Sequence, residues 1–188
     1  MSQSQSASKQ FIWLLPLMIF MGLAVMLWTR LGVDPTVVPQ ATTDHKLPVF
    51  HLSRLADGKP LTNANLPTKP FILNVWGSWC PTCAIEQPFL LKMQQQGVVL
   101  VGVNYKDQPA DALAYLSQRG NPFVLNLQDL KGDFGIDLGV TGAPESFVID
   151  QDQRIRLHIL GEINDEIWLT KLKPCLDRLK LKGAGQCG

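Results

Sequence analysis

The stretch Asn74–Pro88, which reads NVWGSWCPTCAIEQP, places two cysteines three positions apart directly after an apolar run. The run itself, Phe71–Trp76 (FILNVW), is short and apolar, as is typical of a buried strand. A helix is predicted from Cys80 to about Gln95, because Pro81 suits the first turn of a helix. A Cys-x-x-Cys pair at the point where a strand meets a helix indicates a redox-active pair.

The position of Cys80 at the start of the predicted helix suits it to nucleophilic attack. Unpaired backbone N–H groups and the positive end of the helix dipole favour the thiolate there. Cys83 lies one turn further along the same face, close enough to bridge to Cys80. Cys80 is expected to attack a substrate disulfide, after which Cys83 attacks Cys80 and releases the reduced substrate. Trp79 is expected to shield the pair and to offer a flat apolar contact surface.

A structural disulfide and a metal site are the alternatives for this pair. A bridge that closes so short a loop removes little chain entropy, so stability gives little reason for it. A zinc ribbon needs a second close pair of cysteines, whereas Cys175 and Cys187 are twelve positions apart and the histidines are isolated. No metal is therefore predicted. Cys175 and Cys187 either pair with each other or stay free, and both alternatives remain open.

Strands and helices alternate in the rest of the chain. The further predicted strands are 98–103, 123–127, 145–149 and 154–160, the last two forming a hairpin around 150–153. Residues 110–119 are a predicted helix, and Asn164 is expected to cap a final helix that reaches about Leu181 and that Pro174 kinks or divides. His158 alternates with apolar residues and is predicted to be exposed. The order of elements predicts an α/β fold.

The segment Gly142–Glu145 (GAPE) immediately precedes the predicted hairpin. Pro144 is a candidate for a cis proline in a tight turn beside the cysteines. Glu86 and Glu145 are candidate acids that pass a proton to or from a sulfur or repel the wrong partner. The alternatives are an ordinary trans turn and exposed carboxylates.

The N-terminus differs in kind from the rest of the chain. Residues 11–28 are apolar and carry no charge over eighteen positions, and a helix of that length spans about 27 Å. We therefore predict a transmembrane signal anchor at 11–28, after a cytoplasmic tail at 1–10. A cleaved signal peptide is the alternative. Residues 29–46 are predicted to be a linker to a domain at 47–188.

Charge excludes one class of partner. The net charge is +1, with lysine and arginine scattered along the chain. No basic stripe with interleaved aromatic residues occurs, so no nucleic acid partner is expected.

Together these features resemble the DsbE/CcmG family, membrane-anchored thiol:disulfide oxidoreductases of bacterial cytochrome c maturation. The residues that carry the resemblance are 74–83 with Glu86, 102–107, 120–122 and 137–145 running into 147–150. The resemblance implies a thioredoxin fold, in which helices flank a mixed central sheet, and an N-terminal transmembrane helix.

The resemblance also implies a function and its residues. Cys80 is then the nucleophile, Cys83 the resolving thiol and Pro144 the cis proline, with Glu86 and Glu145 as flanking acids. The domain is expected in the periplasm, tethered to the inner membrane. It would act as a reductant that needs no cofactor besides its own redox-active disulfide. Its substrate would be apocytochrome c or a haem-lyase thiol subunit, and its electrons would come from a membrane donor of the DsbD or CcdA type.

Some positions depart from the patterns of related proteins. Asn74 stands where many thioredoxins carry a buried acid, as the family resemblance expects, and this favours Glu86 as the proton carrier. Thr141 replaces an aromatic residue common in the family. Cys175 and Cys187 have no place in the family pattern. The alternative functions are a thiol peroxidase, a general periplasmic disulfide reductase or oxidase, and a non-enzymatic docking module of cytochrome c assembly.

Overall fold

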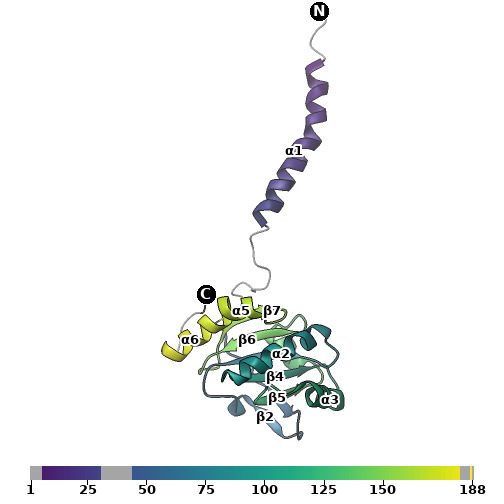
Figure 1. Cartoon of the computed structure of the whole chain (residues 1–188). Coiled ribbons are helices and arrows are strands. Elements are labelled where there is room, and N and C mark those ends of the chain that lie inside the picture. The colour runs from purple at the N-terminus through teal and green to yellow at the C-terminus, as the bar shows by residue number, and fades with distance from the viewer. Residues whose placement is uncertain (1–5, 31–43, 183–186, 188) are drawn as a thin grey trace, which may run out of the picture. The chain divides into compact units, whose positions relative to one another are not determined.

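The computed structural model describes residues 6–30, 44–182 and 187 of the chain, which folds as two units, Met1–Pro35 and Thr36–Gly188 (Figure 1). The predicted linker falls largely on residues 31–43, outside the described residues, as do the first five residues of the predicted tail.

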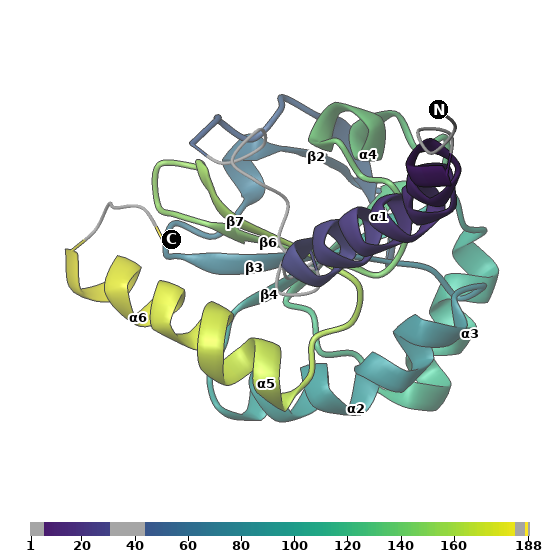
Figure 2. The same cartoon turned by 90° about the horizontal axis from the view of Figure 1, so that it is seen from above.

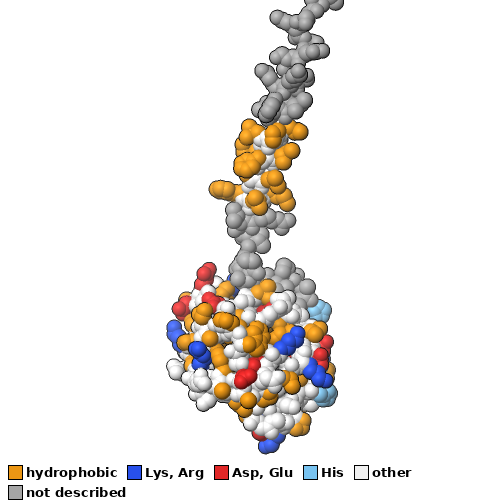
Figure 3. All heavy atoms as spheres, turned by 90° about the vertical axis from the view of Figure 1, so that its right-hand side faces the viewer, with side chains coloured by type: hydrophobic (Ala, Val, Ile, Leu, Met, Phe, Trp, Pro, Cys, Tyr) orange, Lys and Arg blue, Asp and Glu red, His pale blue; other side chains and the backbone are white. Residues whose placement is uncertain are grey.

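The first unit contains helix α1, which spans Ser6–Arg30. The side chains described for it, from Leu15 to Trp28, are largely hydrophobic and exposed (Figure 3). Over the part of the chain that the structure describes, no helix combines the length and the apolar character needed to cross a membrane.

A mixed sheet of seven strands forms the centre of the second unit within residues 44–182, in the order β2-β1-β5-β4-β3-β6-β7. Strands β3, β4 and β5 run parallel, and each of the other pairings is antiparallel. The strands are β1 (His51–Arg54), β2 (Pro60–Thr62), β3 (Phe71–Trp76), β4 (Leu100–Tyr105), β5 (Leu125–Asp129), β6 (Glu145–Ile149) and β7 (Ile155–Leu160).

Helices cover both faces of this sheet (Figure 2). The helices α2 and α3 and the C-terminal helical segment pack on one face, and α4 packs on the other. Their bounds are η1 (Asn63–Asn65), α2 (Pro81–Gln95), α3 (Pro109–Arg119), α4 (Asp133–Leu138), α5 (Asp165–Ile167), the π-helical η2 (Trp168–Leu172) and α6 (Lys173–Lys182).

Strand β3 feeds both hydrophobic cores. Ile72 and Trp76 point toward α2, and Phe71, Leu73 and Val75 point to the opposite face. All six residues of β3 are buried, which explains why five of them are apolar and why apolar and polar residues do not alternate along it. Each large apolar side chain buried in this way contributes about 1.5–3 kcal/mol.

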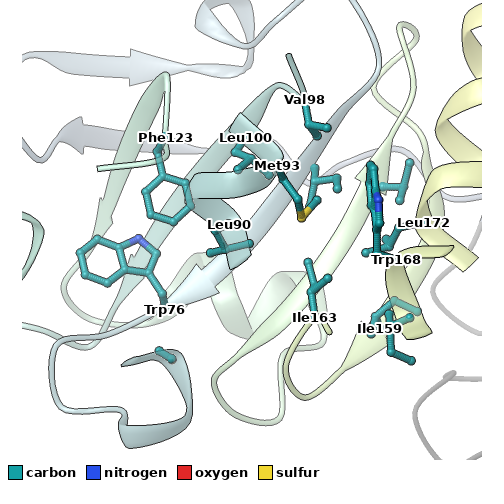
Figure 4. Packing of buried hydrophobic residues seen from close by; sticks show 14 of the residues in the cluster. Trp76, Leu90, Met93, Val98, Leu100, Phe123, Ile159, Ile163, Trp168 and Leu172 are labelled. Atoms are coloured by element: carbon teal, nitrogen blue, oxygen red, sulfur yellow. The ribbon is translucent and has the colours of Figure 1, made fainter. Parts of the chain in front are cut away.

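The core beneath α2 extends along the sheet toward the C-terminal helices. Figure 4 shows Trp76 and Phe123 at one end of the cluster and Trp168 at the other. The rings of Trp76 and Phe123 stack with centroids 5.7 Å apart. Strand β3, from which the chain continues to Cys80, is therefore anchored in a continuous apolar layer.

Within the second unit, each predicted strand is a strand and each predicted helix is helical, with bounds that differ by a few residues. The thioredoxin-like α/β fold is confirmed with them. The side chain of Asn164 caps the C-terminal helical segment as predicted, accepting a hydrogen bond from the backbone N–H of Ile167 at 2.9 Å. This segment is divided by the π-helical turn immediately before α6, and Pro174 lies in the first turn of α6. Strands β1 and β2 and helix α4 were not predicted from the sequence.

Candidate active site

The cysteine pair lies where the sequence places it, at the start of α2. Cys80 is the N-cap residue, Pro81 opens the helix, and Cys83 lies in its first turn. The two cysteines are joined by a disulfide bond. The Sγ atom of Cys80 also accepts a hydrogen bond from the backbone N–H of Cys83 at 3.1 Å. After reduction, this N–H and the helix dipole would favour a thiolate at Cys80, which is what the predicted nucleophile requires.

Trp79 stands beside the pair with about half of its surface, 51%, exposed. Its ring N–H donates to the carbonyl oxygen of Tyr105 at 3.1 Å, which fixes the ring over the end of β4. Gly77 allows this position, because a Cβ there would lie 2.4 Å from the Nε1 atom of Trp79. Trp79, the residue before Cys80 in the chain, therefore presents a half-exposed ring, and its role as a contact surface stays a prediction.

Asp107 holds the loop between β3 and α2, and the sequence analysis assigned it no role. Its carboxylate accepts hydrogen bonds from the backbone N–H of Ser78 at 2.6 Å and from the Ser78 hydroxyl at 2.7 Å. Asn104 donates to the same carboxylate at 2.8 Å. Asp107 follows the end of β4, so its position next to the loop depends on the parallel pairing of β3 and β4, which no local motif reveals.

Glu86 is buried one turn beyond Cys83 on α2. One carboxylate oxygen accepts from the backbone N–H of Ile163 at 2.6 Å, and the other accepts from Nδ2 of Asn74 at 3.1 Å. Burial raises the pKa of Glu86 to about 7, although both hydrogen bonds lower it. The nearby charge of Glu162 adds to the rise. The alternative of an exposed carboxylate is therefore wrong for this residue.

Asn74 can serve Glu86 in both of its protonation states. Its Nδ2 also donates to the hydroxyl of Ser146 at 3.0 Å. Its Oδ1 is buried and has no hydrogen-bond partner among the described residues. A half-turn of the amide would bring this oxygen to a protonated Glu86, which then donates. The asparagine at this position thus fits a carboxyl group that gains and loses a proton.

Pro144 and Glu145 lie at the start of β6, next to the cysteines. The Ala143–Pro144 peptide bond is cis, as predicted. The carbonyl oxygen of Ala143 lies 3.4 Å from the Sγ atom of Cys80. The turn before β6 therefore borders the Sγ atom of Cys80 directly.

Glu145 is buried and ionised. Burial raises the pKa of Glu145, but hydrogen bonds from His158, Thr141 and Gly142 outweigh this and hold its pKa below the usual range. The alternative of an exposed carboxylate is wrong here too.

The prediction that His158 is an exposed strand residue is wrong. Only 1% of its surface is exposed, because its ring stacks on Phe147 with centroids 4.0 Å apart and its Nε2 lies 2.7 Å from Oε2 of Glu145. His158 was predicted to be exposed because Arg154, Arg156 and His158 alternate with apolar residues. A shift of register between Val148 and Ile149 breaks this alternation, so His158 faces the core.

Cys175 and Cys187 form a second disulfide, which resolves the two alternatives in favour of pairing. Cys175 is buried in the core under α6, and Cys187 packs against the same cluster. This bond is separate from the disulfide between Cys80 and Cys83.

This chain is similar to known proteins over most of its length. The family model described as Redoxin matches residues 42–172. The thiol:disulfide interchange protein DsbE of Pseudomonas aeruginosa is 42% identical over 172 residues, covering 91% of this chain and 96% of that protein. The protein of the same name from Escherichia coli K12 is 38% identical over 183 residues, covering 94% and 99%.

A solved structure shows the same fold. The crystal structure of a thiol:disulfide interchange protein DsbE from Chlorobium tepidum matches with a TM-score of 0.60 and 26% identity. The match covers 76% of this chain and 98% of that one.

Proposed function

Because this chain belongs to the Redoxin family and, within it, to the DsbE thiol:disulfide interchange proteins, we propose that it is a periplasmic reductant in cytochrome c maturation. Its activity as a thiol:disulfide oxidoreductase follows from the family. The observation that supports this activity most directly is the Cys80–Cys83 disulfide at the N-terminus of α2.

The reaction transfers two electrons from the cysteine pair to a substrate disulfide. The thiolate of Cys80 attacks one substrate sulfur, forms a mixed disulfide and releases the other substrate sulfur as a thiol. Cys83 then attacks Cys80, which releases the second substrate thiol and leaves the Cys80–Cys83 disulfide. No further cofactor enters this cycle.

Glu86 is proposed as the proton carrier for Cys83. Cys83 must lose its proton before it attacks Cys80, and it must regain one when the pair is reduced. A buried carboxyl group with a pKa of about 7 exchanges protons at neutral pH. Cys83 and Glu86 lie on adjacent turns of α2, which supports this assignment.

The proposed substrates are the haem-attachment cysteines of apocytochrome c or a haem-lyase thiol subunit. Haem attachment needs free thiols, so an oxidised substrate must first be reduced. The exposed face of Trp79 beside Cys80 suits an extended, cysteine-bearing peptide. Electrons would return to the pair from a membrane donor of the DsbD or CcdA type.

The proposed anchor is the N-terminal segment at residues 11–28. It carries no charged residue, and α1 includes it. The anchor would hold the domain at the periplasmic face of the inner membrane.

The reduction potential tests the proposed direction. The full chain is equilibrated in thiol redox buffers and alkylated, and the peptide that contains both Cys80 and Cys83 is quantified by mass spectrometry. A potential of about −200 mV or lower supports a reductant. A value near −120 mV, as for a strong oxidant, would refute the proposal and favour a disulfide oxidase.

Cytochrome c maturation in cells tests the redox role against a docking role. In a strain that lacks its own DsbE, the wild-type chain is expected to restore covalent haem attachment, and Cys80→Ser is expected to abolish it. A Cys80→Ser chain that still supports full maturation would favour the docking module. Cys83→Ser distinguishes the peroxidase alternative, since only a peroxidase would retain peroxide turnover.

Membrane fractionation tests the anchor. The full chain is expected to remain in the pellet when membranes are washed with high salt and then with alkaline carbonate, both without detergent. Release by either wash would refute the anchor, and neither result bears on the potential of the cysteine pair.

A further inference from the structure

The turn at residues 141–143 is fixed by a single carboxylate. The Oε1 atom of Glu145 accepts from the backbone N–H of Thr141 at 2.8 Å, from the Thr141 hydroxyl at 2.5 Å and from the backbone N–H of Gly142 at 2.9 Å. Three donors on one oxygen hold a short segment in which Thr141 is exposed and Gly142 is partly exposed. The buried carboxylate of Glu145 thus holds in place a turn that lies at the surface of the molecule.

The other oxygen of this carboxylate contacts a buried histidine. Oε2 of Glu145 lies 2.7 Å from Nε2 of His158, and the two side chains are 3% and 1% exposed. His158 belongs to β7 and lies opposite Phe147 of β6, on whose ring it stacks. A buried carboxylate that loses one of its partners is costly, so His158 determines where Glu145 sits.

The turn reaches the reacting sulfur. The carbonyl oxygen of Ala143 lies 3.4 Å from Sγ of Cys80. Hence a connected series of contacts leads from His158 through Glu145 and the turn to Cys80. A peptide that approaches Cys80 from this side must pass along the turn.

We propose that His158 and Thr141 are positioning residues that act through Glu145. They hold the turn at residues 141–143 in place against Cys80, so that a peptide disulfide meets the nucleophile in the productive orientation. The proposal rests on thiol:disulfide exchange at Cys80, and it is independent of the direction of electron flow and of the cytochrome substrate.

Three variants of the full chain separate positioning from stability. His158→Phe keeps an aromatic ring to stack on Phe147 and removes the partner of Glu145. His158→Gln removes the ring and offers an amide donor to Glu145. Thr141→Val keeps the shape of an exposed side chain and removes one hydroxyl donor, so it leaves the core untouched. The double variant Thr141→Val/His158→Phe tests whether the two residues act through the same carboxylate.

Each reduced protein is reacted with two oxidised probes, and the second-order rate constants are compared. One probe is a peptide with an intramolecular disulfide, and the other is the small aromatic disulfide dithiobis(nitrobenzoate). With the peptide, His158→Phe and Thr141→Val are each expected to react about tenfold more slowly, as for the loss of one charge-assisted hydrogen bond. With the small probe, which does not extend along the turn, the rates should change less than about threefold.

The rates of His158→Gln and of the double variant test whether both residues act through Glu145. His158→Gln is expected to retain the peptide rate within about threefold, and the double variant should lose less than the product of the two single losses. Wild-type peptide rates in Thr141→Val and in a folded His158→Phe would overturn the proposal. Equal slowing with both probes would also overturn it, because the change would then lie in the thiol of Cys80 itself. If the chain proves to be an oxidant, the same comparison is made with a reduced peptide.

Discussion

Glu86 couples the stability of the domain to pH. Its pKa is about 7 in the folded state against a usual value of 4.5, so between these values the folded protein binds more protons than the unfolded one. We therefore expect the free energy of unfolding to fall by about 3 kcal/mol as the pH rises from 4.5 to 7. Glu86→Gln should remove this fall. Denaturant titrations at a series of pH values measure it.

A control substitution and the pH range make this prediction specific to Glu86. Glu166→Gln, which changes an exposed carboxylate on the neighbouring α5, should keep the full pH dependence. Glu145 acts in a different range, because its lowered pKa places its loss of stability below pH 4.5. An unchanged fall in Glu86→Gln would show that another group causes it.

Asp107 is expected to stabilise the active-site loop. Asp107→Ala leaves Ser78 and Asn104 without their shared acceptor, and we expect a loss of about 1–3 kcal/mol in the free energy of unfolding. The same loop ends at Cys80, so the rate of mixed-disulfide formation should also decrease. Asp152→Ala, in the exposed hairpin turn, serves as the matched control and should change neither quantity. Equal effects of the two substitutions would contradict a specific role of Asp107.

The sequence predicted the chemical roles open to single residues better than it predicted their burial and their contacts in the fold. The roles open to Cys80 and Cys83 follow from their own spacing and from the strand before them. His158 could not be placed in the same way, because its burial depends on the ring of Phe147 and on the irregular register of β6 and β7. Asp107 likewise acquires its partner through the pairing of β3 with β4, two strands separated by α2.

At the scale of elements, the loop between β3 and α2 depends on a close backbone approach. Gly77→Ala would bring a Cβ into the ring of Trp79, which has to move and give up its hydrogen bond to Tyr105. Because the ring is half exposed and free to shift, we expect a stability loss of only about 1 kcal/mol. The exchange rate with a peptide disulfide should fall, since the apolar surface beside Cys80 is displaced.

Gly142→Ala is a suitable stability control for Gly77→Ala. A Cβ at Gly142 meets no atom within 4 Å, so the free energy of unfolding should be unchanged there. If Gly77→Ala leaves both stability and peptide exchange at wild-type values, Trp79 does not need the position that it occupies.

The elements that sequence patterns revealed carry an apolar run, a helical period or a helix-capping side chain. Strands β3 and β4 are buried at every residue and therefore appear as apolar runs. Strands β1 and β2 have only four and three residues, and β1 alternates between exposed and half-buried positions, so they leave no such run. Helix α4 has six residues between Gly132 and Gly139, both with positive φ, and is too short for a helical period to be recognised.

At the scale of the whole molecule, the second disulfide ties the C-terminal segment to the core. Cys187→Ser is expected to lower the free energy of unfolding by about 2–3 kcal/mol, because the bond closes a loop between residues 12 positions apart. Cys175→Ser should cost more, since it also buries a hydroxyl group in an apolar cluster. Exchange rates at Cys80 should stay at the wild-type value in both variants. Peptide mapping of alkylated protein checks the pairing, and free thiols at both positions in oxidised protein would contradict it.

The bond between Cys175 and Cys187 also requires that each molecule meets an oxidant. Two thiols must lose two electrons and two protons to form this bond, so a newly made chain depends on a disulfide-forming oxidant. Cys80 and Cys83 of the same chain must be held as thiols for it to act as a reductant. A protein proposed to keep the thiols of others reduced is thus itself completed by oxidation. Cells without a disulfide-forming catalyst should accumulate it with an unfastened C-terminus and a working active site.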